Sequence, residues 1–173
     1  MGGRRRVRRG GGPPPPTPLE GPEPRPPYPF EVRQSAIAGR GAFATRAIAP
    51  GVRIIEYAGE RLTPAEAETR YPDAAEQAHH TFLFAIDEQV VVDAGVNGNE
   101  ARWLNHSCAP NCDVVVDGGR LWIETMQDIE PGEELVYDYA YVLAERHTPA
   151  AKKRYPCRCG AITCRGTILA KKR

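Results

Sequence analysis

The chain has 173 residues, 41% of them hydrophobic, and a formal net charge of +1 at neutral pH. This length suits one domain with a real core, and no apolar run approaches the roughly 18 residues that a transmembrane helix needs. Arginines near the N-terminus are followed by no apolar segment, so a secretory signal is excluded. Five cysteines, clustered late, do not resemble a secreted disulfide framework. We therefore expect an intracellular protein whose reduced thiols could hold a metal.

The small net charge conceals three regions of different sign. Residues 1–30 carry six Arg against two Glu (+4), and residues 31–150 carry nine Arg against twenty acids (−11). Residues 151–173 carry eight basic residues and no acid (+8). An acidic body of this kind can attract a basic, lysine-rich protein and raise its rate of encounter.

Residues 1–29 are dominated by Arg, Gly and Pro. They cannot bury enough apolar area to offset their chain entropy, so we predict a disordered arm. Its cluster of arginines, which begins with Arg4, can contact nucleic-acid phosphates without sequence specificity. A solubilising tail is the equal alternative.

From residue 30 the pattern becomes one of short strands separated by turn signals. A glycine-rich stretch, Gly39 to Ala44, formally matches a dinucleotide fingerprint, but no buried strand precedes it and Pro50-Gly51 interrupts the helix that should follow. Its two glycines suit either close approach of a ligand or a hairpin turn. The strands that we predict lie at 31–33, 52–57, 82–86, 89–92, 113–116, 121–124 and 135–141.

One short helix is predicted among these strands. Thr63, Pro64 and Glu66 form a strong helix start, with an N-cap, a proline at the first position and a glutamate three residues after the cap. The helix should cover 65–71 and end before Pro72. With a hairpin at Asp117-Gly118-Gly119, the chain reads as a β-rich domain rather than a wound α/β sheet.

Two clusters of polar residues suggest a site. Asn105 to Asn111 reads Asn-His-Ser-Cys-Ala-Pro-Asn and follows Arg102-Trp103-Leu104, which we interpret as the end of a buried element. Locally this stretch is an ordinary turn, and adjacent His and Cys rarely act as base and nucleophile. Further on, Tyr137 and Tyr139 should share one face of a strand, either as aromatic packing or as the lining of a narrow channel.

The third cluster is Cys157-Arg158-Cys159 with Cys164. Gly160 permits the turn that brings Cys164 back. Three thiolates need a fourth ligand to complete a tetrahedral zinc site, and either Cys108 or Cys112 can supply it. Reduced bystander thiols are the alternative, which three cysteines within eight residues disfavour.

Taken together and in order, these motifs resemble the SET-domain protein-lysine N-methyltransferases with an attached post-SET segment, and without the cysteine-rich pre-SET segment that many members carry. The resemblance covers about residues 31–169. It rests on Gly39-Arg40-Gly41, Glu56-Tyr57-Ala58-Gly59-Glu60, Val92-Asp93-Ala94, Gly98-Asn99-Glu100-Ala101-Arg102, Asn105–Asn111, Glu134-Leu135-Val136-Tyr137-Asp138-Tyr139 and the late cysteines.

The resemblance implies a mainly β, β-clip-like SET fold with short helices. The Asn105–Asn111 and Tyr137–Tyr139 segments would form a pseudoknot, and a zinc-bound post-SET tail would follow. It divides the chain into the arm (1–29), the SET domain (30–145), and the post-SET zinc segment with its basic tail (146–173). Zinc would be held by Cys108, Cys157, Cys159 and Cys164, leaving Cys112 free.

The same resemblance assigns the site. S-adenosylmethionine would be bound by Arg40, Gly41, Phe43, Asn105, His106, Tyr139 and Leu169. Tyr139 would be the catalytic tyrosine, Tyr57 would line the lysine channel, and Tyr137 would occupy the position that sets the number of methyl groups, where a phenol favours mono- or dimethylation. Phe82 stands where many members have a tyrosine, and some members share the phenylalanine.

The implied activity is methyl transfer to a lysine of a basic, histone-like or DNA-associated protein, by a monomer that contacts no membrane. The implied location is the cytoplasm or nucleoid of a bacterium, or the nucleus or chromosome of a eukaryote. The alternative is a catalytically silent SET-like module that binds protein or nucleic acid. A small-molecule methyltransferase of the wound α/β type is disfavoured by the many short strands.

Overall fold

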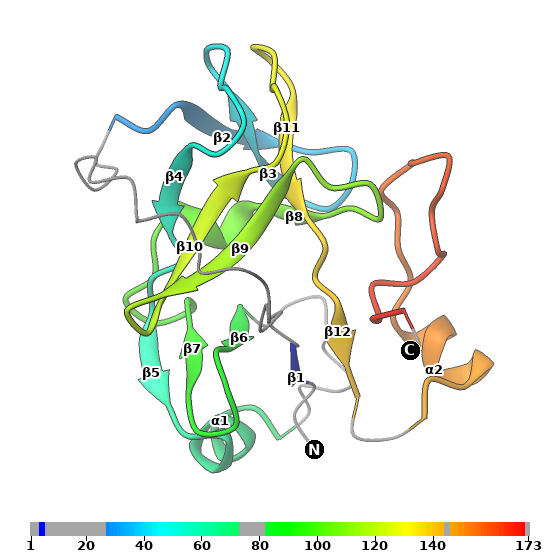
Figure 1. Ribbon diagram of the computed structural model, residues 1–173. Coiled ribbons are helices and arrows are strands. Elements are labelled where there is room, and N and C mark those ends of the chain that lie inside the picture. The colour runs from blue at the N-terminus through cyan, green and yellow to red at the C-terminus, as the bar shows by residue number, and fades with distance from the viewer. Residues whose placement is uncertain (1–3, 6–26, 73–81, 144–145, 172–173) are drawn as a thin grey trace, which may run out of the picture.

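The computed structural model describes residues 4–5, 27–72, 82–143 and 146–171. Its largest unit is a curled seven-stranded sheet in the order β2-β3-β11-β9-β10-β4, with β8 added beside β11 (Figure 1). Within it, β9 and β10 form the hairpin predicted at Asp117-Gly118-Gly119. The strands are β2 (Phe30–Gln34), β3 (Arg40–Ala44), β4 (Arg53–Glu56), β8 (Asn105–His106), β9 (Cys112–Asp117), β10 (Arg120–Thr125) and β11 (Glu134–Tyr137).

A smaller three-stranded sheet lies at the other end of this body, in the order β5-β7-β6. Its strands are β5 (Glu60–Leu62), β6 (Leu83–Ala85) and β7 (Val91–Asp93), and α1 (Pro64–Arg70) packs beside it. The predicted helix start is confirmed, because Thr63 and Glu66 form both hydrogen bonds of a capping box.

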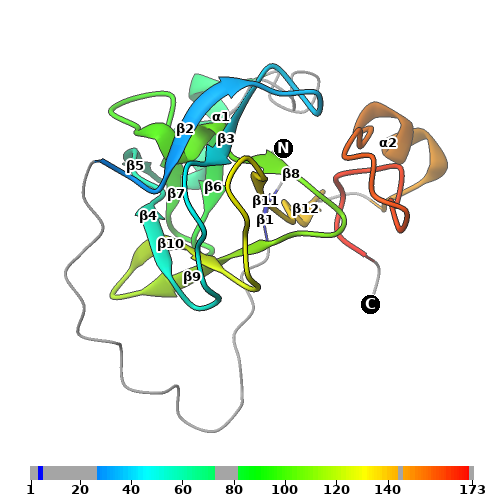
Figure 2. The same ribbon diagram turned by 90° about the horizontal axis from the view of Figure 1, so that it is seen from above.

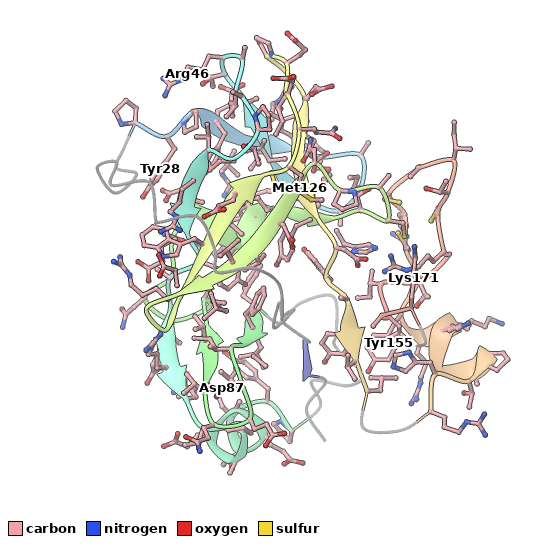
Figure 3. The ribbon with its side chains drawn as sticks, in the orientation of Figure 1. Tyr28, Arg46, Asp87, Met126, Tyr155 and Lys171 are labelled. Carbon is pink, nitrogen blue, oxygen red and sulfur yellow. The ribbon has the colours of Figure 1, made fainter. Side chains whose placement is uncertain are left out.

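A third unit contains the end of the chain (Figure 2). Here α2 (Pro149–Arg154) and the tail to Lys171 pack against β12 (Tyr141–Val142), which also pairs with β1 (Arg4–Arg5). A small separate core holds this unit together, and Tyr155, labelled in Figure 3, lies within it. The buried members are Tyr141, Ala151, Tyr155, Ile168 and Leu169. Within the described residues, neither helix is long or apolar enough to cross a bilayer.

Strands β3, β5 and β8 and a short 3-10 helix, η1 (Glu100–Trp103), were not predicted from the sequence. Two further features differ from the predictions. The strand predicted over 135–141 is wrong in length, because β11 ends at Tyr137 and the chain bends before β12. At the bend Ala140 takes a φ of +42°, and its N–H donates to the Asp138 carboxylate at 2.9 Å. The second feature is α2, which was not predicted although Thr148 and Pro149 repeat the cap-and-proline start of α1.

The segment from β8 to the start of β9 is hydrogen-bonded to β11. Asn105 and His106 pair in parallel with Val136 and Tyr137. The Asn111 side chain then donates to the Glu134 carbonyl and accepts from the Val136 N–H, each at 2.9 Å. These bonds interlock two segments far apart in sequence, as the predicted pseudoknot requires.

Asp93, at the end of β7, has a structural role that the sequence did not reveal. It is fully buried and accepts hydrogen bonds from Arg70 and the Tyr71 hydroxyl, each at 2.9 Å, so it ties α1 to the small sheet. Burial, and then the hydrogen bond to Asp93, raises the pKa of Tyr71. The Tyr71 phenol therefore stays protonated and remains a donor at neutral pH.

We predict that Asp93→Ala lowers the free energy of unfolding by about 2–3 kcal/mol, because it leaves donors at a buried position without their acceptor. Urea denaturation of the zinc-loaded chain measures the change. Glu88→Ala removes an exposed carboxylate from the nearby turn and should have an effect within about 0.5 kcal/mol. Equal destabilisation by the two variants would contradict the structural role of Asp93.

Candidate active site and metal centre

Asn105, in β8, connects the start of β3 to the start of β11. Its side-chain amide donates to the Arg40 carbonyl at 2.9 Å and to the Glu134 carboxylate at 2.7 Å. A Cβ at Gly41 would lie 2.2 Å from the same carboxylate, so any larger residue here would have to displace the Glu134 side chain. The close approach that Gly41 permits is thus to a side chain of the protein itself, while Gly39, at a φ of +50°, makes the turn.

An aromatic cluster lies beside this junction, with rings from three segments of the chain. Tyr57 follows β4, Phe84 lies in β6, Tyr137 ends β11 and Tyr139 lies beyond it. The ring centroids of Tyr57 and Phe84 are 5.5 Å apart, those of Phe84 and Tyr137 6.3 Å, and those of Tyr137 and Tyr139 4.9 Å. The predicted proximity of Tyr137 and Tyr139 therefore holds although the strand ends between them.

Two hydroxyls of this cluster are held by backbone carbonyls. Tyr57 donates to the Phe82 carbonyl at 3.1 Å, and Tyr139 donates to the Leu104 carbonyl at 2.9 Å. Phe82 itself packs edge-on against Trp103 at 5.5 Å. Phenols anchored in this way around largely apolar rings can orient a polar group that enters the cluster while excluding most water from it.

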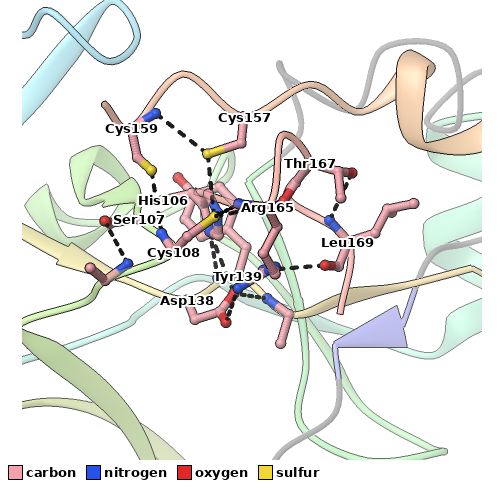
Figure 4. Close-up of polar contacts among 12 residues, drawn as sticks. His106, Ser107, Cys108, Asp138, Tyr139, Cys157, Cys159, Arg165, Thr167 and Leu169 are labelled. Atoms are coloured by element: carbon pink, nitrogen blue, oxygen red, sulfur yellow. Dashed lines mark hydrogen bonds and ion pairs between the residues drawn. The ribbon is translucent and has the colours of Figure 1, made fainter. Parts of the chain in front are cut away.

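His106 connects the aromatic cluster to the cysteines (Figure 4). Its Nδ1 accepts from the Tyr139 backbone N–H at 3.0 Å, so the ring proton of the neutral imidazole belongs on Nε2. That nitrogen faces the Cys108 sulfur at 3.4 Å. In this arrangement the imidazole can donate to the Cys108 sulfur while it accepts from the backbone that follows β11.

Four cysteines meet beside His106: Cys108, Cys157, Cys159 and Cys164, whose sulfurs all lie within 4.8 Å of one another. A zinc ion with Zn–S bonds of about 2.3 Å requires S···S separations near 3.8 Å. The distances from Cys108 to Cys157 and to Cys164 are 3.7 and 4.0 Å, which fit. The four thiols thus match the ligand set expected from the sequence.

Each of these sulfurs also accepts a backbone N–H, at 3.4 or 3.5 Å, as a cluster of thiolates requires. Burial alone would raise the pKa of Cys159, but the N–H groups of Cys108 and Ala161 and the neighbouring thiols lower it to about 6. Cys112 differs: it is buried in β9, and its burial raises its pKa to about 12. It therefore remains a neutral thiol outside the cluster.

An ion pair fastens the tail to the segment that carries Tyr139. Both terminal nitrogens of Arg165 bind the Asp138 carboxylate, at 2.7 and 2.8 Å, and one also donates to the Leu169 carbonyl at 3.2 Å. Burial, the largest single cause, would raise the pKa of Asp138, but the Arg165 hydrogen bonds, the Ala140 N–H and the nearby positive charge together leave the pKa below its usual value. No local sequence pattern indicates this pair, because its partners are 27 residues apart.

The residues predicted to bind the cofactor fall into two groups. Arg40, Gly41 and Phe43 lie on the β3 side, where Asn105 meets them, and the Phe43 ring is covered by the Arg33 guanidinium at 4.0 Å. Leu169 is fully buried in the small C-terminal core. It also lines a pocket of about 320 Å³ with Lys152, Arg165, Thr167, Ala170 and Lys171.

This pocket has the size of a small-molecule site, combines apolar and cationic groups, and shares Arg165 with the Asp138 ion pair. The two groups are therefore connected through His106, Asp138 and Arg165. In these respects the residues fit a polar nucleoside cofactor.

Comparison with known proteins agrees with this geometry. A family model described as "SET domain" matches residues 39–140. The chain is 41% identical over 140 residues to the histone-lysine N-methyltransferase trithorax of Drosophila virilis. It is 42% identical over 139 residues to the H3 lysine-4 specific histone-lysine N-methyltransferase of Schizosaccharomyces pombe, and 39% identical over 145 residues to that of Saccharomyces cerevisiae.

These three matches cover 78%, 78% and 81% of this chain, but only 3%, 14% and 13% of the relatives. The chain therefore spans a small part of the length of these curated relatives.

We predict that the purified chain contains about one zinc ion, and that Cys159→Ser loses it because three thiolates hold the ion too weakly. Elemental analysis measures the metal content. Cys112→Ser is the matched control, since it removes a thiol outside the cluster, and it should keep the ion. Equal zinc content in both variants would show that the cluster is not the metal site.

Proposed function

Because this chain belongs to the SET-domain family, we propose that it transfers methyl groups to the ε-amine of a lysine in a basic protein. The observation that carries the proposal is the convergence of Tyr57, Tyr137 and Tyr139 beside the Asn105–His106 strand. S-adenosylmethionine, when bound, supplies the methyl group on a sulfonium. Arg40, Gly41, Phe43, Asn105, His106, Tyr139 and Leu169 are the residues that we propose to hold it.

The aromatic cluster would prepare the lysine for the reaction. A protonated lysine has no lone pair, so the site must favour the neutral amine. Burial among the rings of Tyr57, Phe84 and Tyr137 lowers the lysine pKa because it withdraws the ammonium from water. The Tyr139 hydroxyl, held by the Leu104 carbonyl, would orient the reacting groups. Most of the acceleration then comes from alignment.

Zinc is proposed as a structural ion. Cys108 is two residues from His106, and Cys164 is next to Arg165, so an ion between these cysteines would hold the tail against the aromatic cluster. Structural sites of this kind are closed by four protein ligands and leave no position open for chemistry.

The substrate that we propose is histone-like or another DNA-associated basic protein. The names of the relatives refer to histone lysines, and the −11 charge of residues 31–150 would attract a basic partner. We propose that the protein acts as a monomer inside the cell, at the chromosome or nucleoid. Non-specific nucleic-acid contact by residues 1–29 stays a prediction, since most of that arm is outside the described residues.

We predict that Tyr139→Phe lowers the rate of methyl transfer by about 100-fold, because the reacting groups lose the hydroxyl that orients them. Transfer of radiolabelled methyl groups to histone H3 or to the proteins of a cell extract measures the rate. Tyr28→Phe removes a hydroxyl beside β2, outside the aromatic cluster, and should keep full activity. A wild-type chain that labels no lysine would favour a catalytically silent module.

We predict that the wild type forms mainly mono- and dimethyl-lysine and that Tyr137→Phe shifts the product towards trimethyl-lysine. The phenol can hold a water molecule in the space that further methyl groups need, and phenylalanine cannot. Mass spectrometry of the modified peptide distinguishes the products. Predominantly trimethylated product from the wild type would refute this role of Tyr137.

A further inference from the structure

The N-terminal strand β1 lies between two strands that belong to different parts of the fold (Figures 1 and 2). It pairs antiparallel with β12, with Arg4 opposite Val142 and Arg5 opposite Tyr141. On its other side it lies beside β6 of the small sheet. We call the space between the facing edges of β6 and β12 the strand slot.

Both edges of the strand slot present backbone groups to whatever lies between them. Among the described residues, β6 is an outer strand, since the order of its sheet is β5-β7-β6. In β12, the Tyr141 N–H and carbonyl are bonded to Ile168 and Ala170 in the tail. Because successive residues of a strand direct these groups to opposite edges, those of Val142 face the slot. Such edges accept an extended chain as an added strand.

The strand slot also borders the aromatic cluster. Phe82 immediately precedes β6, and Phe84 lies within it. Tyr139 precedes β12 by two residues. Since Phe84 contacts both Tyr57 and Tyr137, an extended peptide in the slot runs past the ring cluster from one wall to the other. Tyr139 lies two residues before the strand that forms one wall of the slot.

We propose that the N-terminal arm is a built-in pseudosubstrate, in which Arg4–Arg5 occupies the strand slot and competes with the basic protein for it. The proposal rests on the proposed function, because it takes the aromatic cluster as the site of the lysine. It goes beyond that function because it makes the N-terminal arm an inhibitor of substrate binding to the same chain.

The composition of the arm suits this role. Its Arg-rich start, Arg4 to Arg9, is a basic segment like the proposed substrate, and the charge of −11 over residues 31–150 would attract it. Residues 1–29 contain no lysine, so the arm can occupy the slot but offers no ε-amine for methylation. The intervening residues 6–26 could span roughly 70 Å at about 3.3 Å per residue, so their length does not limit binding within one molecule.

Competition from a tethered segment should appear in KM rather than in kcat. A tethered segment meets its own site at an effective concentration on the order of 1 mM, so even a weak contact raises the apparent KM several-fold. Proline lacks the N–H that a strand donates, so Arg4→Pro with Arg5→Pro should empty the slot. Arg8→Pro with Arg9→Pro makes the same change of charge and composition outside β1.

The first experiment measures methylation of a histone-type peptide by the full-length chain and both double variants. Arg4→Pro/Arg5→Pro should lower KM by roughly three- to tenfold with kcat unchanged, and Arg8→Pro/Arg9→Pro should behave like the wild type. An equal decrease of KM in both double variants would overturn the proposal, because the loss of positive charge alone would then explain it. No change in KM for Arg4→Pro/Arg5→Pro, with an active enzyme, would overturn the proposal.

The second experiment does not depend on catalysis. A fluorescent peptide with the sequence of residues 1–9 is titrated with each protein, and its anisotropy reports binding. Arg4→Pro/Arg5→Pro should bind the peptide at least about threefold more tightly than the wild type or the control variant do, because its own arm no longer fills the slot. Equal affinities would overturn the pseudosubstrate. If the affinities differ while no variant methylates any lysine, the arm occupies the slot and the proposed function fails.

Discussion

Asn111 makes the contact on which the rest of this structure depends. Its buried amide bonds to the backbone on both sides of Leu135, so the loop after β8 cannot separate from β11 without leaving polar groups unsatisfied inside the fold. This contact fixes Asn105 and His106 beside Tyr137. One amide thus aligns the residues proposed to bind cofactor, metal and substrate, which local sequence patterns would indicate only as a turn.

The four-cysteine cluster and the aromatic cluster are linked by direct contacts. His106 accepts the Tyr139 N–H on one side of its ring and faces Cys108 on the other. A second link runs from Asp138 to Arg165, within the chain segment that the cysteines hold. Because both links end at Tyr139 or its neighbour, any loosening of the tail is transmitted to the proposed catalytic hydroxyl. In this way the proposed structural zinc would support the site although it performs no chemistry.

Local signals were sufficient where the interaction itself is local. The capping box at Thr63 and the turn at Asp117-Gly118-Gly119 depend on neighbours within a few residues, and the structure confirms both. The same reasoning could have found α2 from Thr148 and Pro149. The predicted strand continued beyond Tyr137, because no local pattern indicates the bend at Ala140 or the hydrogen bond from its N–H to the Asp138 carboxylate.

By itself the sequence determined the kinds of groups that the protein has: five cysteines, three of them within eight residues, Tyr137 and Tyr139 two residues apart, an acidic body and an arginine arm without lysine. Only the tertiary structure decided which groups meet. It paired Arg165 with Asp138, buried Asp93 under α1, turned the Gly41 contact inward to Glu134 and set β1 between β6 and β12. Such pairings join segments far apart in the chain, so they depend on how sheets and loops close on one another rather than on any pattern within a segment.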